Sequence, residues 1–337
     1  MSEAMGAIPR SVRNATGLRF PWTRLARLMI SSHRPSSGAY VQRVPSGPLS
    51  DSLYRDIQDF QRAVETNYFG ADAMTCHHGR DYTLLLRSCG DVFALSVRDR
   101  AGRITGLLSL NRLRFRLPGG RIRPVMYVAH LHVLPECRAG TTLPALIARA
   151  VFPVLLGGGV ICGLARVGGG FNPTRVSRVL NLPAYAPVTT ARLITYTADA
   201  TLPFHGAPVR VATEQEVRDR YAHLTRDRIA AVGGNPAMRS ALPPRWLIAE
   251  DGSACGCIED YHATTRWIRA DGSEFRQSNI SFFGWRDPAA AASFVRGAVR
   301  ETALIGAERV RIILDERLAP PVVDAIGIAP EREFRWS

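Results

Sequence analysis

One order of expected secondary-structure elements occurs twice along this chain of 337 residues. Each time a strand and a helix precede a pair of apolar strands, and a further strand, a second helix and another strand follow. This alternation predicts an α/β fold of the α+β type, with two mixed sheets flanked by helices. The length is sufficient for two domains of ordinary size.

The expected boundaries follow from composition and from the places where the elements fall. Residues 1–37 are rich in arginine and poor in acids, and we expect them to be a poorly ordered basic extension. The first unit spans residues 38–198 and the second spans residues 209–337. Between them, residues 199–208 contain the prolines and glycine that are typical of a linker.

Apolar side chains at alternating or helical spacing predict the individual elements. In the first unit we expect strands at residues 40–44, 92–97, 104–116, 124–134, 160–167 and 191–197, and helices at 50–67, 141–155 and 172–180. In the second unit we expect strands at residues 209–212, 246–250, 254–261, 279–285, 309–314 and 332–336, and helices at 214–229, 287–305 and 320–326.

The charge of the chain bears on its partners. All 43 basic residues are arginine, and the formal net charge is +14. Arginine pairs with phosphate through two parallel hydrogen bonds, so this excess favours an anionic partner such as a coenzyme, a nucleic acid or an acidic surface. A GC-rich coding sequence produces the same bias without any functional reason.

The cysteines and the most apolar segment exclude several classes of protein. The six cysteines are scattered and no secretory signal is visible, so we expect a cytoplasmic protein without a disulfide framework. Neither Cys76-His77-His78 nor Cys255-Gly256-Cys257 has a second ligand pair at a metal-site spacing, so no metal is expected. Residues 145–166 are apolar but interrupted by Arg149 and a glycine run, which favours a buried helix, turn and strand over a transmembrane segment.

The segment with the most chemical information joins the strand at 124–134 to the helix at 141–155. A short loop containing arginine and glycine before a helix predicts an anion site, because backbone N–H groups and the positive helix end face the same point. Gly140 lets the backbone approach a phosphate, Arg138 is able to pair with it, and Thr141 or Thr142 adds a hydroxyl.

In these residues the chain resembles the GCN5-related N-acetyltransferase (GNAT) superfamily. The pyrophosphate loop of that family has the pattern Gln/Arg-x-x-Gly-x-Gly/Ala after a strand that ends in Val-x-Pro. Here Val133-Leu134-Pro135 precedes Arg138 and Gly140, whereas Cys137 and Thr142 depart from the pattern. The resemblance implies acetyl-CoA or a longer acyl-CoA as co-substrate. The residues that it implies for binding are Leu131, Val133, Arg138, Ala139, Gly140, Thr141, Thr142 and Asn172.

A second match begins at Asn172, where the family often has an asparagine followed by a tyrosine and Gly-Phe. The tyrosine position holds Val179 and the Gly-Phe position holds Leu182-Pro183, but Tyr185 lies nearby. In the family two strands splay apart around the acyl-pantetheine arm, and a tyrosine or serine protonates the departing thiolate. The resemblance therefore implies Tyr185 as the catalytic acid. Asn172 is equally suited to capping its own helix.

Acyl transfer to an amine also needs a base that removes a proton from the ammonium group. His130 and His132 alternate with apolar residues on the expected strand, so both should point to one face. Either is a candidate base, since histidine titrates near neutral pH. The alternative is that both are ordinary sheet residues that hydrogen-bond with their neighbours.

The corresponding segment of the second unit differs at the loop. It contains Arg286-Asp287-Pro288, with no glycine after the arginine, and the carboxylate would repel a phosphate. We therefore expect only the first unit to bind coenzyme and the second to be a degenerate copy, a tandem arrangement that occurs in the superfamily.

The resemblance implies an N-acyltransferase that moves an acyl group, acetyl in the first instance, from acyl-CoA to a primary amine of a small metabolite or peptide. An acyl carrier protein is an alternative donor. Two other functions stay open: a Fem-type ligase that forms peptide bonds from aminoacyl-tRNA, and a non-catalytic binding protein with a GNAT fold.

Overall fold

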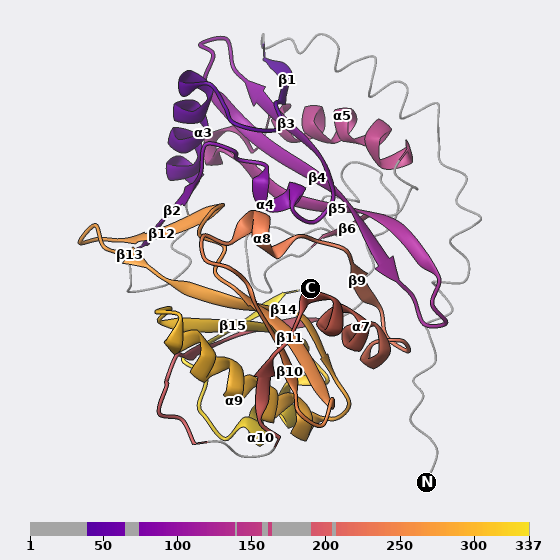
Figure 1. The fold of residues 1–337 in the computed structure, drawn as a ribbon. Coiled ribbons are helices and arrows are strands. Elements are labelled where there is room, and N and C mark those ends of the chain that lie inside the picture. Colours follow the sequence, from indigo (N-terminus) through magenta and orange to yellow (C-terminus); the bar gives the residue numbers. More distant parts are fainter. Residues whose placement is uncertain are drawn as a thin grey trace.

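The computed structural model describes residues 39–64, 74–138, 140–156, 161–163, 190–203 and 207–336. In these ranges the chain forms two large sheets, one in each half of the molecule, and helices pack on both faces of each (Figure 1). A third, three-stranded sheet lies at one side between the halves. The mixed-sheet architecture expected from the sequence is confirmed.

The six-stranded sheet of the first half has the order β1-β3-β4-β5-β6, and β9 pairs with β4 off this path. Its strands are β1 (Tyr40–Val44), β3 (Asp91–Arg98), β4 (Ile104–Arg116), β5 (Ile122–Val133), β6 (Ile161–Gly163) and β9 (Ala230–Val232). Its helices are α3 (Asp51–Val64), α4 (Leu84–Arg87) and α5 (Thr142–Leu156), with a short 3-10 turn at Pro135–Cys137.

Alternation along β4 divides the core of this sheet between two faces. Leu107 packs with Ile57 and Phe60 of α3 on one face. Leu108 packs with Leu146 of α5 on the other. All strand pairs of this sheet are antiparallel except β5 with β6, which are parallel because α5 connects them.

The seven-stranded sheet of the second half has the order β16-β7-β15-β14-β11-β10-β8. Its strands are β7 (Ala191–Thr197), β8 (Val209–Val211), β10 (Arg245–Ala249), β11 (Ala254–Glu259), β14 (Gln277–Trp285), β15 (Arg309–Asp315) and β16 (Arg332–Trp336). Its helices are α7 (Glu214–Leu224), α9 (Pro288–Leu304) and α10 (Ala319–Ile326), and α8 (Pro236–Arg239) contacts α4 of the first half. Helices α9 and α10 cover one face of the sheet and α7 covers part of the other.

The two halves exchange strands, which the sequence analysis does not anticipate. We expected residues 191–197 to be the last strand of the first unit, but β7 lies between β15 and β16 in the second sheet. Residues 199–208 therefore connect two strands of the same sheet, β7 and β8. In the other direction, β9 from the second half pairs with β4 of the first.

The third sheet joins the halves more directly. Its order is β13-β12-β2, so β2 (Met74–His78) of the first half pairs with β12 (Thr265–Arg269), which pairs with β13 (Glu274–Phe275). None of these strands was expected from the sequence. They are short, and their partners lie far along the chain, so no local periodicity marks them.

Local chemistry explains several element ends. The expected helix at residues 214–229 ends at Leu224, and Thr213 and Glu216 form a capping box at its start. The apolar segment 145–166 divides into the end of α5 and the strand β6, as expected. In the described parts of the chain, no helix is both long enough and apolar enough to cross a bilayer.

Candidate functional site

The strand β5 contains a β-bulge at the point where the sequence predicted chemistry. Gly106 lies opposite Val133 and Leu107 opposite His132, but Ser109 lies opposite Ala129, so one extra residue is accommodated between them. His130 has a φ of 51°, a left-handed conformation that is uncommon for residues other than glycine. The bulge changes the direction of the last residues of β5 just before the loop.

The neighbouring strand β6 pairs only with the residues before the bulge. Its partners are Met126, Tyr127 and Val128. No strand in the described ranges pairs with Ala129–Val133 on that side of β5. The backbone of Leu131 and Val133 is therefore left without a ladder partner on that side among the described strands, as a splayed pair of strands requires.

The residues after β5 form the loop that precedes α5. Three of its amides donate within the loop: Cys137 N–H to Leu134 O at 2.9 Å, Arg138 N–H to Pro135 O, and Gly140 N–H to Cys137 O at 3.1 Å. Thr141 O accepts from Ala145 N–H at 2.9 Å, which places Thr141 at the helix cap, and the first turn has no acid. The first amides of a helix have no intrahelical partner. The helix start, more than the loop itself, thus supplies the positive potential for an anion.

The side chains of the loop lie in different environments. Arg138 and Thr141 are exposed. Thr142 is buried, and its hydroxyl lies 3.4 Å from that of Thr105. Its methyl group would lie 2.6 Å from a Cβ added to Gly106. Thr142 thus faces the core, and only its backbone N–H is left for a ligand. Glu136 forms an ion pair with Arg103 at 3.1 Å.

His130 belongs to a cluster of rings that the sequence did not reveal. Its ring centroid lies 5.0 Å from that of Tyr82 and 5.5 Å from that of His78, and its Nδ1 lies 3.5 Å from Ser109 Oγ. His78 Nε2 in turn lies 3.7 Å from Cys76 Sγ. No signal in the sequence links these residues, because they come from three separate segments: residues 76–82, Ser109 and His130.

The cluster holds its histidines in the neutral form. Burial lowers the pKa of His130 well below its ordinary value, and the charges of His78 and His132 add to this effect. Burial lowers the pKa of His78 to about 4, and repulsion from His132 and His77 contributes to this shift. The pKa of His132 is lowered by burial and by the Arg138 guanidinium of the loop. Both candidate bases are therefore unprotonated at neutral pH.

Three of the expected site residues lie outside the described ranges: Ala139, Asn172 and Tyr185. In the ranges that are described, no group of three or more His, Cys, Asp or Glu side chains is arranged to hold a metal ion.

The second half repeats the bulge but not the loop. Cys255 lies opposite Gly284 and Cys257 opposite Ser281, and Phe282 has a φ of 50°. By register, Phe282 corresponds to His130 and Gly284 to His132. Only Arg286 and Asp287 separate β14 from α9, and the Asp287 carboxylate accepts from Ala290 N–H at 2.9 Å as the cap of that helix.

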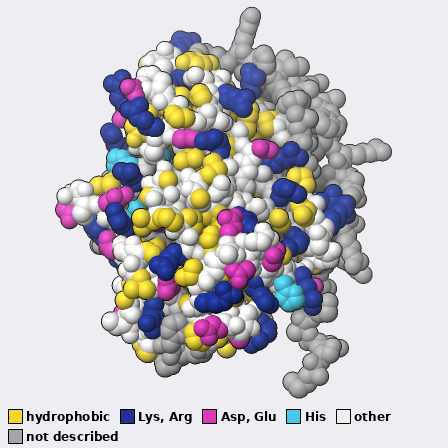
Figure 2. Space-filling view, viewed as in Figure 1, with side chains coloured by type: hydrophobic (Ala, Val, Ile, Leu, Met, Phe, Trp, Pro, Cys, Tyr) yellow, Lys and Arg dark blue, Asp and Glu magenta, His cyan; other side chains and the backbone are white. Residues whose placement is uncertain are grey.

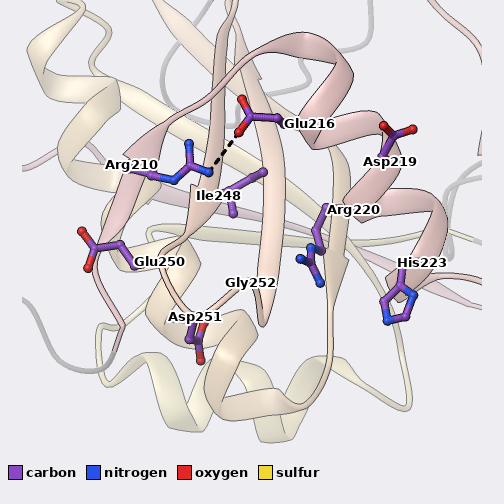
Figure 3. A pocket seen from close by; sticks show the side chains of 9 residues that line it. All are labelled: Arg210, Glu216, Asp219, Arg220, His223, Ile248, Glu250, Asp251 and Gly252. Carbon is purple, nitrogen blue, oxygen red and sulfur yellow. Dashed lines mark hydrogen bonds and ion pairs between the residues drawn. The ribbon is translucent and has the colours of Figure 1, made fainter.

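The second half also contains a hollow of about 550 Å³ between α7, β8 and the turn that joins β10 to β11 (Figure 3). Side chains of both charges line it, and Arg210 and Glu216 pair across it at 3.0 Å. It lies in the half that lacks the loop, and its four carboxylates outnumber its two arginines, which disfavours a phosphate. We therefore place the candidate site at β5 and the start of α5.

The sequence matches no protein-family model, and no curated protein matches it. Solved structures do match its fold. N-myristoyltransferase of Saccharomyces cerevisiae, solved with bound myristoyl-CoA, aligns with a TM-score of 0.60 at 10% identity, over 89% of this chain and 78% of that one. A GCN5-related N-acetyltransferase from Kribbella flavida aligns with a TM-score of 0.51 at 15% identity, over 90% and 71%.

The chain has the GNAT fold. It has this fold in tandem, since each half contains its own bulged strand followed by a helix and a parallel strand. The loop motif that resembles the GNAT pattern in the sequence lies between β5 and α5 of the first half.

Proposed function

We propose that this protein is an N-acyltransferase that moves an acyl group from an acyl-CoA to a primary amine of a small metabolite or peptide. One observation carries the proposal. A bulged strand, an exposed arginine and a helix start without an acid occur together in the first half, within a fold whose solved relatives include one with bound myristoyl-CoA.

The first half has suitable groups for the coenzyme. The pyrophosphate would lie at the first amides of α5, with Arg138 and the Thr141 hydroxyl beside it, because helix dipole and side chains favour an anion there. The pantetheine amides would pair with β5 at Leu131 and Val133, where no described strand pairs with it, and would replace the 3.4 Å contact of Arg138 Nε with Val133 O. The acyl group would then lie near the bulge.

His132 is the better placed of the two candidate bases. An alkyl ammonium has a pKa near 10.4, so the acceptor must lose a proton before its nitrogen attacks the thioester carbonyl. His132 is neutral and lies beside the loop, whereas His130 packs among the rings of His78 and Tyr82. The amine nitrogen then forms the amide bond, the carbon–sulfur bond breaks, and the coenzyme thiolate takes up a proton. Tyr185 is the residue that the resemblance suggests for this last step.

Ligand-dependent melting tests the proposal. Acetyl-CoA and myristoyl-CoA are added separately to the purified protein, with the coenzyme nucleotide 3′,5′-ADP as a control for the phosphate contacts. Binding at 100 times Kd adds about 2.7 kcal/mol to stability and raises Tm. The acyl-CoA with the larger shift indicates the preferred chain length, and mass spectrometry of ligand retained by the purified protein checks that assignment.

An absence of any shift with every acyl-CoA contradicts the proposal. Co-purification of RNA, with binding that weakens steeply as salt rises, would instead favour the ligase that uses aminoacyl-tRNA. An acyl carrier protein as donor would appear as acyl transfer from the loaded carrier without binding of free acyl-CoA.

A further inference from the structure

Arg311 on β15 has fewer partners than Arg239 and Arg296, the two fully buried arginines of the second half. Arg239 forms an ion pair with Glu259, and Arg296 donates to the carbonyl oxygens of Ile326 and Pro203. Arg311 donates from Nε to Asn279 Oδ1 at 2.9 Å, and no carboxylate in the described residues lies within ion-pair distance of it. A half-buried cation without a counter-charge is costly, and such groups commonly have an anionic ligand.

Asn279 provides a second, independent sign of a missing ligand. It is 9% exposed, and its oxygen is occupied by Arg311. Its amide nitrogen is buried and has no hydrogen-bond partner among the described residues. Buried polar groups are nearly always paired, so an unpaired amide nitrogen beside a guanidinium that has no carboxylate partner points to an acceptor supplied by a ligand.

The pair faces the first half. Asn279, Arg311 and Thr195 lie opposite one another on three adjacent strands, so they share a face of the sheet, whereas Val310 and Ile312 are buried on the α9 side. Two residues before Arg311, Arg309 lies 4.5 Å from the ring centroid of Phe275 on β13.

The three-stranded sheet continues from this contact toward the candidate site. β13 and β12 lead to β2 of the first half, where Cys76 lies opposite Trp267. Burial lowers the pKa of Arg311, and both Tyr261 and Cys76 lie near enough to oppose this effect. Cys76 also contacts His78, which packs against His130. The Arg311–Asn279 pair therefore lies across the junction of the halves from the histidine cluster.

We propose that Arg311 and Asn279 bind a carboxylate of the acyl acceptor, which is therefore a molecule with both an amine and a carboxylate, such as an amino acid or a short peptide. This inference rests on the proposed function for the role of the amine. The guanidinium offers two parallel N–H groups and the amide a third donor, a set that matches the two oxygens of a carboxylate. The first half then supplies the donor site and the second half holds the acceptor.

Direct binding of acceptors tests the inference without any need for turnover. The melting temperature is measured with each standard L-amino acid and with short peptides, and with the carboxamide of each, in the absence of coenzyme. We expect some of the acids to raise Tm and their carboxamides to bind about 10–100-fold more weakly, since a buried donor pair is left unsatisfied by the amide. Acyl-CoA binding, measured in parallel, reports on the proposed function separately.

Two variants complete the experiment. Arg311→Gln should abolish the preference of acid over carboxamide, and because Arg311 has no counter-charge the Tm without ligand should stay the same or rise. Arg317→Gln, two residues beyond the end of β15 and with a side chain that is 81% exposed, is the matched control and should keep the preference. Equal shifts with acids and carboxamides, shifts only with phosphate monoesters, no shift at all, or a preference that survives in Arg311→Gln would each overturn the inference.

Discussion

The strands β5 and β14 have the same irregularity in the same register, yet the chain that follows them differs. After β5, residues 134–141 form a loop and a helix start that has no acid in its first turn. After β14, Arg286 and Asp287 lead straight into α9, and Asp287 itself occupies the helix start. The bulge thus belongs to the shared architecture of both halves, whereas a helix start without an acidic residue occurs only after β5.

The bulged residues show the same contrast. Phe282 lies 5.4 Å from Trp246 and 5.6 Å from Tyr221 between ring centroids, and the Arg218 guanidinium covers its ring at 4.5 Å. At the corresponding place, His130 contacts the polar groups of Ser109, Tyr82 and His78. In the second half, packed aromatic side chains surround the bulged residue. In the first half, titratable groups surround it. The second half thus has a shorter loop, a capping carboxylate and an aromatic residue where the first half has the proposed coenzyme site.

The largest expected effect comes from giving the first half the internal carboxylate of the second. Gly140→Asp should abolish acyl-CoA binding, because the new carboxylate lies where the phosphates are expected. The position tolerates a side chain, since an added Cβ meets only Cys137 O at 3.4 Å. Isothermal titration with acetyl-CoA and myristoyl-CoA measures the loss.

Two controls sharpen this result. Gly140→Asn has the same shape without the charge and should retain most of the binding. Arg286→Ala changes the corresponding arginine of the second half, which already pairs with Asp287 at 2.9 Å, and should leave binding unchanged. If Arg286→Ala is the variant that weakens binding, the roles of the two halves are reversed.

The next largest effect concerns His132, whose counterpart in the second half is Gly284. His132→Ala should lower kcat by about 10²–10⁴-fold if the imidazole is the general base. The acidic limb of the pH profile should flatten, and the affinity for acyl-CoA should stay nearly the same. His223→Ala, at the end of α7, is a control that should keep full activity. Wild-type turnover in a double His130→Ala, His132→Ala variant would remove both histidines from the mechanism.

Much of the fold was predictable because its signals are local. Alternating apolar residues, glycine turns and helix caps identified most strands of the two large sheets and the helices α3, α5, α7, α9 and α10, but not the short helices α4 and α8. The helix expected at residues 172–180 lies outside the described residues. The placement of β7 in the second sheet, and the strands β2, β9, β12 and β13, were not predictable, since they depend on pairing between distant segments.

The candidate site divides in the same way. The loop at 131–142 is a contiguous motif and was found from the sequence. Tyr82, Ser109 and His78 join His130 only after folding, and Arg311 is one arginine among 43 until its lack of a carboxylate partner in the described residues is seen. The expectation that His130 and His132 share one face assumed a regular strand. The bulge interrupts that regular alternation.

Corresponding buried positions in the two sheets should also differ in their effect on stability. By register, Asn111 of β4 corresponds to Glu259 of β11. Asn111 donates to Leu86 O, whereas Glu259 accepts from Arg239 at 2.7 Å between Oε1 and Nη2. Glu259→Gln leaves a buried guanidinium without its counter-charge and should cost about 3–5 kcal/mol. Asn111→Ala should cost about 1–3 kcal/mol. Urea unfolding measures both, and equal losses would contradict this distinction.

The smallest expected effect is a pH dependence that the histidine cluster of the first half contributes to stability. The pKa of His78 is about 4 in the folded protein, below its ordinary value of 6.5, because burial and neighbouring histidines disfavour the charged form. A group with a lowered folded pKa is more protonated in the unfolded chain, so its contribution is complete above pH 6.5 and is lost as pH falls. Between pH 7 and pH 5 this one residue should remove about 1–2 kcal/mol of unfolding free energy. His78→Phe should reduce that slope in urea titrations at the two pH values, and His223→Phe should not, since His223 is exposed on α7. An unchanged slope in His78→Phe would mean that the cluster is protonated in the folded state and is not held neutral by burial.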